Sequence, residues 1–425
     1  MIENEAVQPD RGKFRKNTFM QYMLQLAKYI FPFITIPYLT RVLGPDTYAI
    51  RAYMLAVMGF IMVVLDYGFT TYGTKVIADA HGDTSIENPF TTAIMEMRVI
   101  LCVVVIPIVI GLTFAIPIMA QNPVYVALAY ASVVLKALLP DFVFQGREDM
   151  AIITHRFVLT QVISIILIFW LVNGPEDLLL VPIFELGAAA IALGWSWYEA
   201  IKNQGVSFVR PDKELLVTSA RQSTVFFASS AATTLISALC TVLIGVFDSD
   251  PAEIAYWSVA MTAVTAVQSL YTPMVMALYP HMCSKRDFSM LQRLFVIGLP
   301  IAIVGSIAFG LLDWAVMWVL GGDEYMEGAY VMRLLAPFFV FSFIGQLFGY
   351  PVLAAVGCGR ELSISTIIAA IFNTVVLLVL GFSGYFTLTL LAITRVATEA
   401  VLAASRVYFV LRWKKTEEKL SDENV

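Results

Sequence analysis

Long apolar runs separated by short polar breaks extend along almost the whole chain of 425 residues. Each run holds about 20 residues or more, which is the length of an α-helix that crosses a bilayer. Open strands cannot span lipid, and these runs are longer than the strands of membrane barrels. The pattern therefore predicts twelve transmembrane helices, over residues 18–42, 49–77, 90–119, 123–145, 149–172, 177–201, 218–247, 253–280, 290–320, 326–355, 361–381 and 384–412.

The twelve predicted helices divide into two sets of six around the most polar interior segment, residues 202–217. We accordingly predict two domains. Residues 1–205 carry helices one to six, and residues 206–425 carry helices seven to twelve. The predicted fold class is an all-α integral membrane protein with two six-helix bundles around a central cleft.

The two halves also show signs of an internal repeat. Six crossings per half give both halves the same orientation, so the pseudo-two-fold repeat would be parallel, about an axis along the membrane normal. The fourth-to-fifth connection reads Gly146-Arg147-Glu148 in the first half and Gly359-Arg360-Glu361 in the second. The third helix of each half carries a proline at a matching point, Pro107 and Pro300.

Lysine and arginine are distributed unevenly between the two sides of the membrane. They occupy the N-terminal tail up to Lys16, the connections that follow the even-numbered helices, and the C-terminal tail from Arg412. The opposite connections hold none, apart from the first turn near Arg41 and Arg51. Because basic residues concentrate in cytoplasmic loops, we expect both termini to face the cytoplasm.

The composition agrees with a membrane protein. Hydrophobic residues make up 59% of the chain and charged residues 14%, with a mean hydropathy of +0.79, against about 45–50% and about 25% in soluble domains. These values exclude a cytosolic enzyme, a nucleic-acid-binding protein and a disordered chain. The four cysteines and three histidines are scattered and no P-loop is present, so we expect no metal, no cofactor and no ATP hydrolysis. The first apolar run is too long for a signal-peptide core and is expected to remain as a helix.

A polar stripe lies within the first predicted helix. Gln21, Gln25, Lys28, Pro32 and Thr35 follow a 4-3-4-3 spacing, which puts all five on one face. Lys28 lies about ten residues into this helix, roughly 15 Å from its start. A charge at such depth is costly and marks a functional site by default. We expect this face to line a cavity or to contact a neighbouring helix.

Hydroxyl side chains form similar stripes in the seventh and eighth helices. Their candidate cavity-lining members are Ser230, Thr234, Ser237, Thr262 and Thr265. Hydroxyls at helical spacing either line a polar cavity or form hydrogen bonds between closely packed helices. Both interpretations stay open at the level of sequence.

Further cations fall deep within predicted helices, namely Lys136, Arg333 and Arg395. Arg395 has Glu399 one helical turn further on, so a structural ion pair is an alternative to a role in binding. A cleft with several cations and few fixed anions favours an anionic cargo, such as a phosphate or a pyrophosphate.

Three acidic residues within predicted helices are candidates for ion coupling, namely Asp66, Asp141 and Glu185. Without a nucleotide site, transport must be driven by an ion gradient or by consumption of the product. Carboxylates within a membrane are common carriers of H⁺ or sites for Na⁺. A purely structural role is the alternative for each of the three.

Several segments of this chain resemble a known family. The most specific is Tyr29–Tyr48, which reads YIFPFITIPYLTRVLGPDTY, and the others are Leu65–Gly68, Phe144–Met150 and Gly321–Tyr325. They resemble motifs of bacterial polysaccharide flippases of the Wzx type, in the multidrug/oligosaccharidyl-lipid/polysaccharide exporter (MOP) superfamily. Two positions depart mildly from the pattern, since the family usually has Gly where this chain has Ala49 and Trp where it has Val143.

The resemblance implies a twelve-helix flippase in the bacterial inner membrane. Its cargo would be an undecaprenyl-pyrophosphate-linked oligosaccharide, moved from the cytoplasmic to the outer leaflet by alternating access. Its partners would be this lipid-linked oligosaccharide, membrane lipid, H⁺ or Na⁺ as a coupling ion, and the polysaccharide polymerase machinery. Lys28, Lys136, Arg333 and Arg395 would bind the pyrophosphate or acidic sugars.

The same resemblance bears on three residues of the most specific motif. Arg41 is a weaker binding candidate near the outer mouth, and anchoring the end of the helix is its alternative role. Pro32 and Pro37 would kink the first helix and act as a hinge during opening. A role in packing alone is equally open for the two prolines.

Other functions remain to be weighed against a flippase. An ion-coupled multidrug or cation antiporter of the same superfamily would share the fold, but it would favour a cleft rich in carboxylates and aromatic side chains. A membrane polymerase or ligase needs a large outer loop, and every predicted outer loop here is short. A sugar symporter usually has a basic second-to-third loop, which here reads Ala80-His81-Gly82-Asp83. We therefore expect a transporter and not an enzyme.

Overall fold

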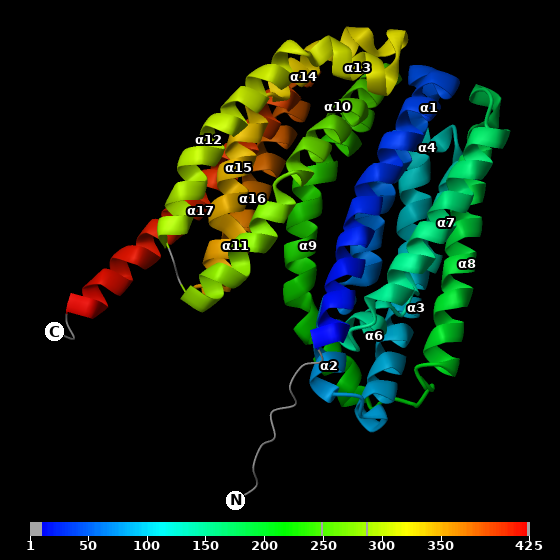
Figure 1. Cartoon of the computed structure of the whole chain (residues 1–425). Helices are drawn as coiled ribbons and strands as arrows, with labels where there is room; N and C mark the ends of the chain where they lie inside the picture. Colours follow the sequence, from blue (N-terminus) through cyan, green and yellow to red (C-terminus); the bar gives the residue numbers. More distant parts are fainter. Residues whose placement is uncertain (1–10, 248–249, 286–287, 423–425) are drawn as a thin grey trace, which may run out of the picture. The chain divides into compact units, whose positions relative to one another are not determined.

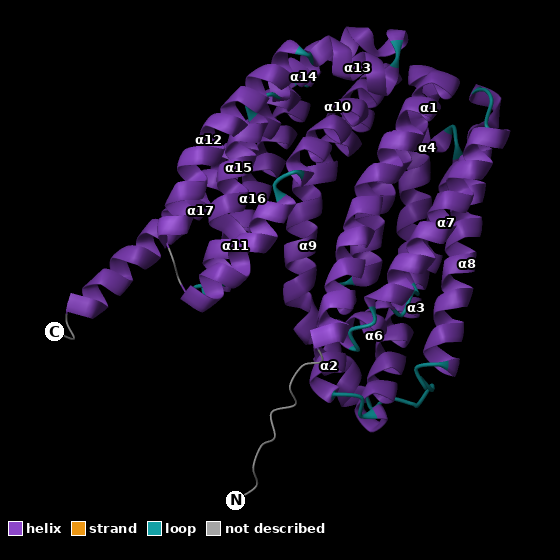
Figure 2. Cartoon of the chain, in the orientation of Figure 1, coloured by secondary structure: helices purple, strands orange, loops and turns teal. Residues whose placement is uncertain are grey.

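The computed structural model describes residues 11–247, 250–285 and 288–422. In these ranges the chain forms helices and short turns and contains no strand (Figure 2). This confirms the predicted all-α fold class. In chain order the elements are α1 (Arg11–Asp66), α2 (Phe69–Ala80), α3 (Thr84–Ala115), α4 (Pro117–Ala120), α5 (Pro123–Ala137), α6 (Asp141–Gly146), α7 (Met150–Leu171), η1 (Pro175–Leu179), α8 (Leu180–Lys202), α9 (Lys213–Phe247), α10 (Pro251–Ser269), α11 (Thr272–Lys285), α12 (Phe288–Leu311), α13 (Asp313–Gly321), η2 (Asp323–Gly328), α14 (Ala329–Leu335), α15 (Phe338–Phe348), η3 (Gly349–Ala354), α16 (Gly359–Ser383) and α17 (Leu388–Asp422), as labelled in Figure 1.

The number of membrane crossings agrees with the prediction. Among the described residues, ten helical segments are long and apolar enough to cross a membrane, and the bent pair Asp323–Leu335 with Phe338–Ala354 makes eleven. One of the ten, Lys16–Ala80, has 65 residues, which is enough for two crossings. Gly44 interrupts the helical geometry inside it, with φ 70° and ψ 170°. Divided there, this segment supplies two crossings, and the total becomes twelve.

The positions of the helix breaks repeat between the two halves. The second crossing breaks at Tyr67–Gly68, between α1 and α2, and the eighth breaks at Leu270–Tyr271, between α10 and α11. The fourth crossing breaks at Leu138–Pro140, and the tenth breaks at Ala336–Pro337. Breaks at equivalent places in helices of the same order support the parallel repeat that the sequence predicts.

The chain forms two compact units. Unit 1 comprises Met1–Thr35, Phe60–Ala115 and Met119–Ser230, and unit 2 comprises Ile36–Gly59, Ile116–Ile118 and Ala231–Val425. Two long helices contribute to both units. Helix α1 passes from unit 1 to unit 2 after Thr35, and α9 does so after Ser230.

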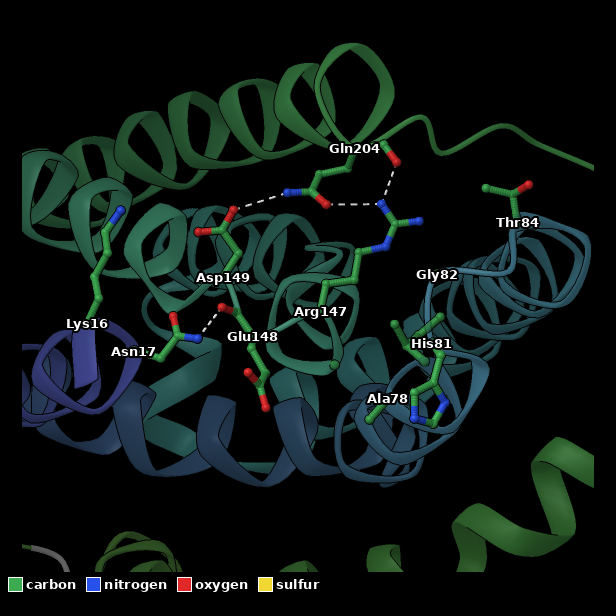
Figure 3. A pocket seen from close by; sticks show the side chains of 12 residues that line it. Lys16, Asn17, Ala78, His81, Gly82, Thr84, Arg147, Glu148, Asp149 and Gln204 are labelled. Atoms are coloured by element: carbon green, nitrogen blue, oxygen red, sulfur yellow. Dashed lines mark hydrogen bonds between the residues drawn. The ribbon is translucent and has the colours of Figure 1, made fainter. Parts of the chain in front are cut away.

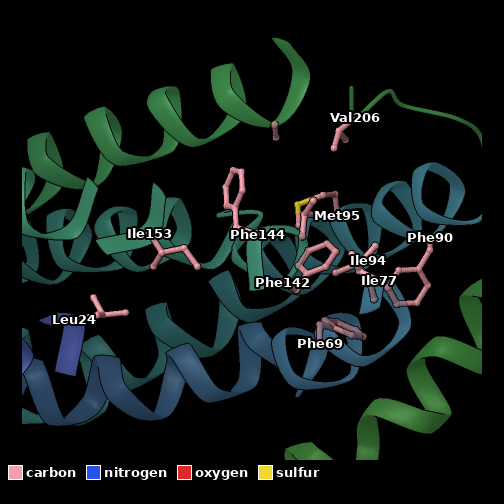
Figure 4. Packing of buried hydrophobic residues seen from close by; sticks show 12 residues of the cluster. Leu24, Phe69, Ile77, Phe90, Ile94, Met95, Phe142, Phe144, Ile153 and Val206 are labelled. Carbon is pink, nitrogen blue, oxygen red and sulfur yellow. The ribbon is translucent and has the colours of Figure 1, made fainter. Parts of the chain in front are cut away.

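Aromatic side chains form the centre of unit 1, as Figure 4 shows. Phe69, Phe90, Phe142 and Phe144 are fully buried, and the rings of Phe90 and Phe142 meet edge to face at 6.4 Å. Helix α2 packs against α6. Their close approach requires Gly146, because a Cβ there would lie 2.6 Å from the Cβ of a buried isoleucine on α2. This packing positions the turn that follows α6.

Outward-facing apolar side chains identify the surface that meets lipid. On α3, Val103 is 61% exposed and Phe114 is 78% exposed, and on α12, Ile301 is 66% exposed. Water would penalise such a surface, whereas lipid tails are as apolar as these side chains. The exposed faces of α3 and α12 are therefore the faces of their units that contact the bilayer.

Candidate functional site

The polar face of α1 lines a cavity in unit 1. Gln21, Gln25 and Lys28 all border a space of about 410 Å³, which we call the α1 cavity. The opposite wall comes from α2 and from the segment that joins α6 to α7, through Thr74, Gln145, Glu148 and Met150. The spacing on α1 predicted this shared face, and the structure brings its first three members together. Three of the lining residues, Gln145, Glu148 and Met150, belong to the Phe144–Met150 motif.

Lys28 is exposed in this cavity. Within the described ranges, no carboxylate lies within ion-pair distance of its ammonium group. The charged groups that influence it most are Asp141 and Arg156. Asp141 is paired with Arg156 and not with Lys28, so the Lys28 ammonium is unpaired and an anionic ligand could approach it.

Asp141 and Arg156 form a bidentate ion pair between α6 and α7. The two nitrogens of the Arg156 guanidinium lie 2.7 and 3.0 Å from the two carboxylate oxygens. Arg156 also donates a hydrogen bond of 2.5 Å to Ser196 on α8, and its side chain is only 5% exposed. The pair therefore ties three helices together behind Lys28.

Asp66 occupies a second buried ion pair. Its carboxylate accepts a hydrogen bond of 2.6 Å from Arg98, and it also accepts one from the hydroxyl of Thr70. Arg98 is 2% exposed and donates to the backbone carbonyl of Leu139 at the break between α5 and α6. The ring of Phe142 lies 5.6 Å from its guanidinium carbon.

The remaining candidates of unit 1 are not part of the α1 cavity lining. Lys136 is exposed near the end of α5 and has no ion-pair partner in the described part of the chain. Glu185 is half-buried on α8, where its backbone carbonyl accepts a hydrogen bond of 3.4 Å from Ser132. These two residues and Lys28 therefore sit in different surroundings within unit 1.

The two deep arginines of unit 2 are both paired with acids. Arg395 lies 3.1 Å from Glu399 on the same helix, and its guanidinium carbon lies 4.6 Å from the ring of Phe338. Arg333 lies 2.7 Å from Asp313, which is buried while the arginine side chain is 69% exposed. Neither arginine is an unpaired charge, in contrast to Lys28.

Arg41 binds the end of a helix within unit 2. Its guanidinium donates hydrogen bonds to the carbonyls of Trp318 and Val319 at 2.8 and 3.0 Å. The hydroxyl of Thr40 donates to the next carbonyl, that of Leu320, at 2.8 Å. The last carbonyls of α13 lack intrahelical partners, so this part of the Tyr29–Tyr48 motif serves as its C-terminal cap.

Most of the predicted hydroxyls form hydrogen bonds within their own helices. Thr35 donates to Phe31, Thr262 to Ser258 and Thr265 to Met261, at 2.8 to 2.9 Å. Ser237 donates to Thr234 at 3.3 Å, and Ser230 is exposed on α9. Each hydroxyl oxygen bonded in this way still has lone pairs to offer a ligand. These hydrogen bonds satisfy the hydroxyl donors, but they do not show whether the residues also line a cavity.

Pro32 and Pro37 lie on either side of the point where α1 leaves unit 1 for unit 2. Helical backbone geometry continues through both residues. Each proline lacks an N–H group, so the hydrogen bonds to the carbonyls one turn earlier are missing. The helix consequently has fewer backbone hydrogen bonds where it passes from one unit to the other.

A second, larger cavity of about 760 Å³ adjoins the α1 cavity, and we call it the vestibule (Figure 3). It shares Asn17 and Glu148 with the α1 cavity. Further lining comes from the start of α1, the α2–α3 turn, the α6–α7 turn and the end of α8, through Lys16, Ile77, Ala78, His81, Gly82, Thr84, Gly146, Arg147, Asp149 and Gln204.

Hydrogen bonds hold the polar walls of the vestibule. Arg147 is ion-paired with the buried Glu87 and donates to the side-chain oxygen of Gln204 at 3.0 Å. The side-chain nitrogen of Gln204 donates to Asp149 at 3.1 Å. Asn17 donates to the carbonyl of Glu148. These contacts attach the start of α1 and the chain after α8 to the α6–α7 turn.

The α2–α3 turn at the rim of the vestibule is also fixed by a local contact. The hydroxyl and the backbone amide of Ser85 donate to the Asp83 carboxylate at 2.6 and 2.9 Å. Both hydrogen bonds favour the ionised carboxylate and hold the pKa of Asp83 below its ordinary value. Asp83, which directly precedes α3, therefore stays charged.

Sequence reasoning missed Arg156 and the partner of Arg98. Arg156 lies six residues after the start of α7, and a charge inside an apolar run was the signal that could have found it. The partners of both arginines lie on other helices, 15 and 32 residues away in the chain. Helical spacing does not relate residues so far apart.

Within the described ranges, no group of three or more His, Cys, Asp or Glu residues could hold a metal ion. The site thus consists of two polar cavities in unit 1, with Lys28 as the cation of the α1 cavity lining.

Known proteins match this chain over most of its length. A family model described as "Polysaccharide biosynthesis protein" matches residues 14–285. The chain belongs to this family. Its similarity to "Putative O-antigen transporter" of Escherichia coli (strain K12) is 24% identity over 403 residues, covering 93% of this chain and 96% of that protein. A protein of the same name from Shigella dysenteriae is 24% identical over 326 residues, covering 75% and 81%.

Solved transporter structures share the fold of this polysaccharide biosynthesis protein. An inward-facing multidrug resistance MATE family transporter of the MOP superfamily has a TM-score of 0.70 at 16% identity, covering 94% of this chain and 96% of that one. A MOP superfamily transporter from Pyrococcus furiosus has a TM-score of 0.60 at 16% identity, covering 93% and 92%. The family match confirms the resemblance stated from the motifs, and the solved structures show that the chain has the fold of these transporters.

Proposed function

We propose that this protein is a flippase for an undecaprenyl-pyrophosphate-linked oligosaccharide. It moves this cargo from the cytoplasmic to the outer leaflet of the bacterial inner membrane by alternating access, in the biosynthesis of a surface polysaccharide. The name of the curated relatives, which refers to O-antigen, supports this class of cargo. The polymerase machinery that joins the repeat units would consume the product and draw transport forward.

The observation that carries the proposal is the surroundings of Lys28. Its ammonium group is unpaired, lies on a helix within the membrane, and borders a cavity whose lining includes three glutamines, two threonines and Glu148. A cation at membrane depth attracts an anion strongly because the low dielectric of the membrane interior weakens screening. A pyrophosphate supplies the matching charge, and the amide side chains supply donors for its oxygens.

The first helix has a second face that suits a lipid-linked cargo. Phe19, Met23, Leu26 and Ile30 on α1 border an apolar groove of about 710 Å³, together with residues of α7 and α8. The polar and apolar cavities lie on nearly opposite sides of one helix. An amphipathic cargo, with a charged head and a long apolar chain, matches a helix of this kind.

The test of the proposal is the substitution Lys28→Met. It removes one charged hydrogen-bond donor and should reduce polymer export by at least about tenfold. The measurement is surface polysaccharide in a host that lacks its own flippase, together with the amount of protein in the membrane. Lys28→Arg should restore part of the export because it keeps the charge.

Lys75→Met is the matched control for this test. Lys75 is also an exposed lysine of unit 1, but it does not belong to the lining of either polar cavity. Its substitution should leave export unchanged. Normal export from Lys28→Met at a normal protein level would contradict the proposal.

The likeness in fold to multidrug transporters raises a second possible function, ion-coupled efflux of cationic drugs. The unpaired charge of Lys28 disfavours it, because a cation in the cavity repels a cationic drug. If the protein exports cationic dyes, and still does so after the charge of Lys28 is removed, the result would favour the antiporter over the flippase.

A further inference from the structure

The vestibule carries hydrogen-bonding groups that its own walls do not use. Figure 3 shows Lys16 and Glu148 on one side of it and His81 and Thr84 on the other. In the described part of the chain, the Lys16 ammonium, the Glu148 carboxylate and the Thr84 hydroxyl have no hydrogen-bond or ion-pair partner. His81 lies 2.7 Å from the carbonyl of Asp79 through Nδ1, which leaves its other ring nitrogen, Nε2, available.

The charges of the vestibule do not favour a second phosphate. Its lining includes two basic residues, Lys16 and Arg147, and two acidic residues, Glu148 and Asp149. Arg147 is already neutralised by Glu87. The remaining charges of the lining, those of Lys16, Glu148 and Asp149, sum to a net negative charge. Free donors and acceptors in a cavity of about 760 Å³ suit a neutral polyol, because each sugar hydroxyl both donates and accepts.

The vestibule and the α1 cavity form one path with unlike ends. They share Asn17 and Glu148. Lys28 follows Asn17 by eleven residues on α1, which is about 16 Å along a helix. A carboxylate therefore borders the path near the start of α1, and an unpaired ammonium borders it further into the membrane. A ligand with a neutral sugar end and an anionic end would lie along it in one direction.

The backbone holds Glu148 in a defined position. Its φ of 56° is in the left-handed region, which costs energy for a residue other than glycine unless neighbouring contacts hold it. Its amide donates to the carbonyl of Gln145 at 3.1 Å, and its own carbonyl accepts from Asn17. The next amide, that of Asp149, donates to Phe144 at 2.7 Å. The carboxylate thus extends from a fixed turn.

We propose that the vestibule is a sugar-binding site in which Glu148 accepts hydrogen bonds from hydroxyls of the first sugars of the cargo, while the pyrophosphate lies at Lys28. This inference rests on the proposed function and extends it to a second cavity with its own specificity-determining residue. His81 and Thr84 contact sugar units further from the pyrophosphate. The sugar preference of this flippase is then set in part within unit 1.

Binding of defined probes to the full-length protein in lipid nanodiscs tests this inference. The probes are farnesyl pyrophosphate and three derivatives that carry one glucose, galactose or N-acetylglucosamine on the pyrophosphate. The wild-type protein should bind at least one derivative more tightly than the bare pyrophosphate. The ratio of the two dissociation constants measures the contribution of the sugar.

Glu148→Gln should reduce that ratio by about tenfold, the effect expected for one hydrogen bond to a charged group. It should not weaken binding of farnesyl pyrophosphate, because it removes a negative charge from the lining that Glu148 shares with Lys28. Retained binding of the bare probe also shows that the variant is folded. Glu361→Gln is the matched control, since Glu361 occupies the equivalent Gly-Arg-Glu motif of the second half. It should change neither affinity.

Two failures can be told apart. If all three derivatives bind no better than farnesyl pyrophosphate, or if Glu148→Gln keeps the wild-type ratio, the vestibule is not the sugar site, whatever the role of Lys28. If Lys28→Met binds farnesyl pyrophosphate as tightly as the wild-type protein does, the proposed function itself fails.

Discussion

At the scale of single residues, the charges within the membrane differ in whether a partner neutralises them. Arg98, Arg156, Arg333 and Arg395 each face a carboxylate within 3.1 Å, whereas Lys28 has no ion-pair partner in the described part of the chain. A paired charge stabilises the fold around it, and removing one partner leaves the other uncompensated. The unpaired charge is the one available to a ligand.

This difference leads to a prediction for Asp141. Asp141→Asn removes one side of the pair with Arg156, whose guanidinium is almost fully buried. It should lower the free energy of unfolding by about 3–5 kcal/mol. The measurement is the thermal unfolding of the purified protein in detergent. Glu185→Gln is the comparison, because Glu185 lies on α8 and takes no part in the pair of Asp141 with Arg156. Carrying a coupling proton would require Asp141 to leave Arg156, so we expect its substitution to act on stability.

The opposite pattern would change this interpretation. An Asp141→Asn protein of normal stability, with transport that no longer depends on the pH gradient, would make Asp141 a coupling residue. The same comparison applies to Asp66, whose partner is Arg98.

How far single residues could be predicted depended on their separation in the chain. Gln21, Gln25 and Lys28 lie within two turns of one helix, so their shared face followed from spacing alone. The ion pair of Arg395 with Glu399 could also be anticipated, since both are on one helix, four residues apart. Asp66 and Arg98 are 32 residues apart, and only the packing of two helices brings them together.

At the scale of elements, α1 contributes residues to both units and to both cavities. Its first part lines the α1 cavity and the vestibule in unit 1, and its later part belongs to unit 2, where Thr40 and Arg41 cap α13. The prolines lie between these parts. A helix that is anchored in both units and weakened between them is suited to bend there.

We predict that the double substitution Pro32→Ala and Pro37→Ala stiffens α1. It restores two backbone donors and should stabilise the helix by up to about 3 kcal/mol per proline. Transport should become slower, because bending would then break intact hydrogen bonds. The measurements are the rate of polymer export at equal protein level and the melting temperature.

Pro107→Ala provides the control for this experiment. Pro107 also lies inside a membrane helix, α3, but all of α3 belongs to unit 1. Its substitution should affect transport little. Wild-type transport by the double variant would show that Pro32 and Pro37 serve packing and not bending.

At the scale of the whole molecule, the distribution of basic residues makes a prediction about orientation. With both termini in the cytoplasm, the connection near Gln121 faces outward and the end of α8 near Asn203 faces inward. In a variant without the native cysteines, Gln121→Cys should react with a membrane-impermeant maleimide in intact cells. Asn203→Cys should react only after the cells are permeabilised. Labelling in the reverse order would require the opposite topology.

The sequence by itself determined the class of this protein and the number of its crossings, whereas the breaks inside the second, fourth, eighth and tenth crossings appeared only in the structure. Both properties follow from hydropathy over about 20 residues, which acts locally. Only the tertiary structure decided which buried charges are neutralised, because a partner on another helix is chosen by how the helices pack. For the same reason the vestibule was not foreseen. Its lining comes from four separate segments of unit 1, which the sequence does not bring together.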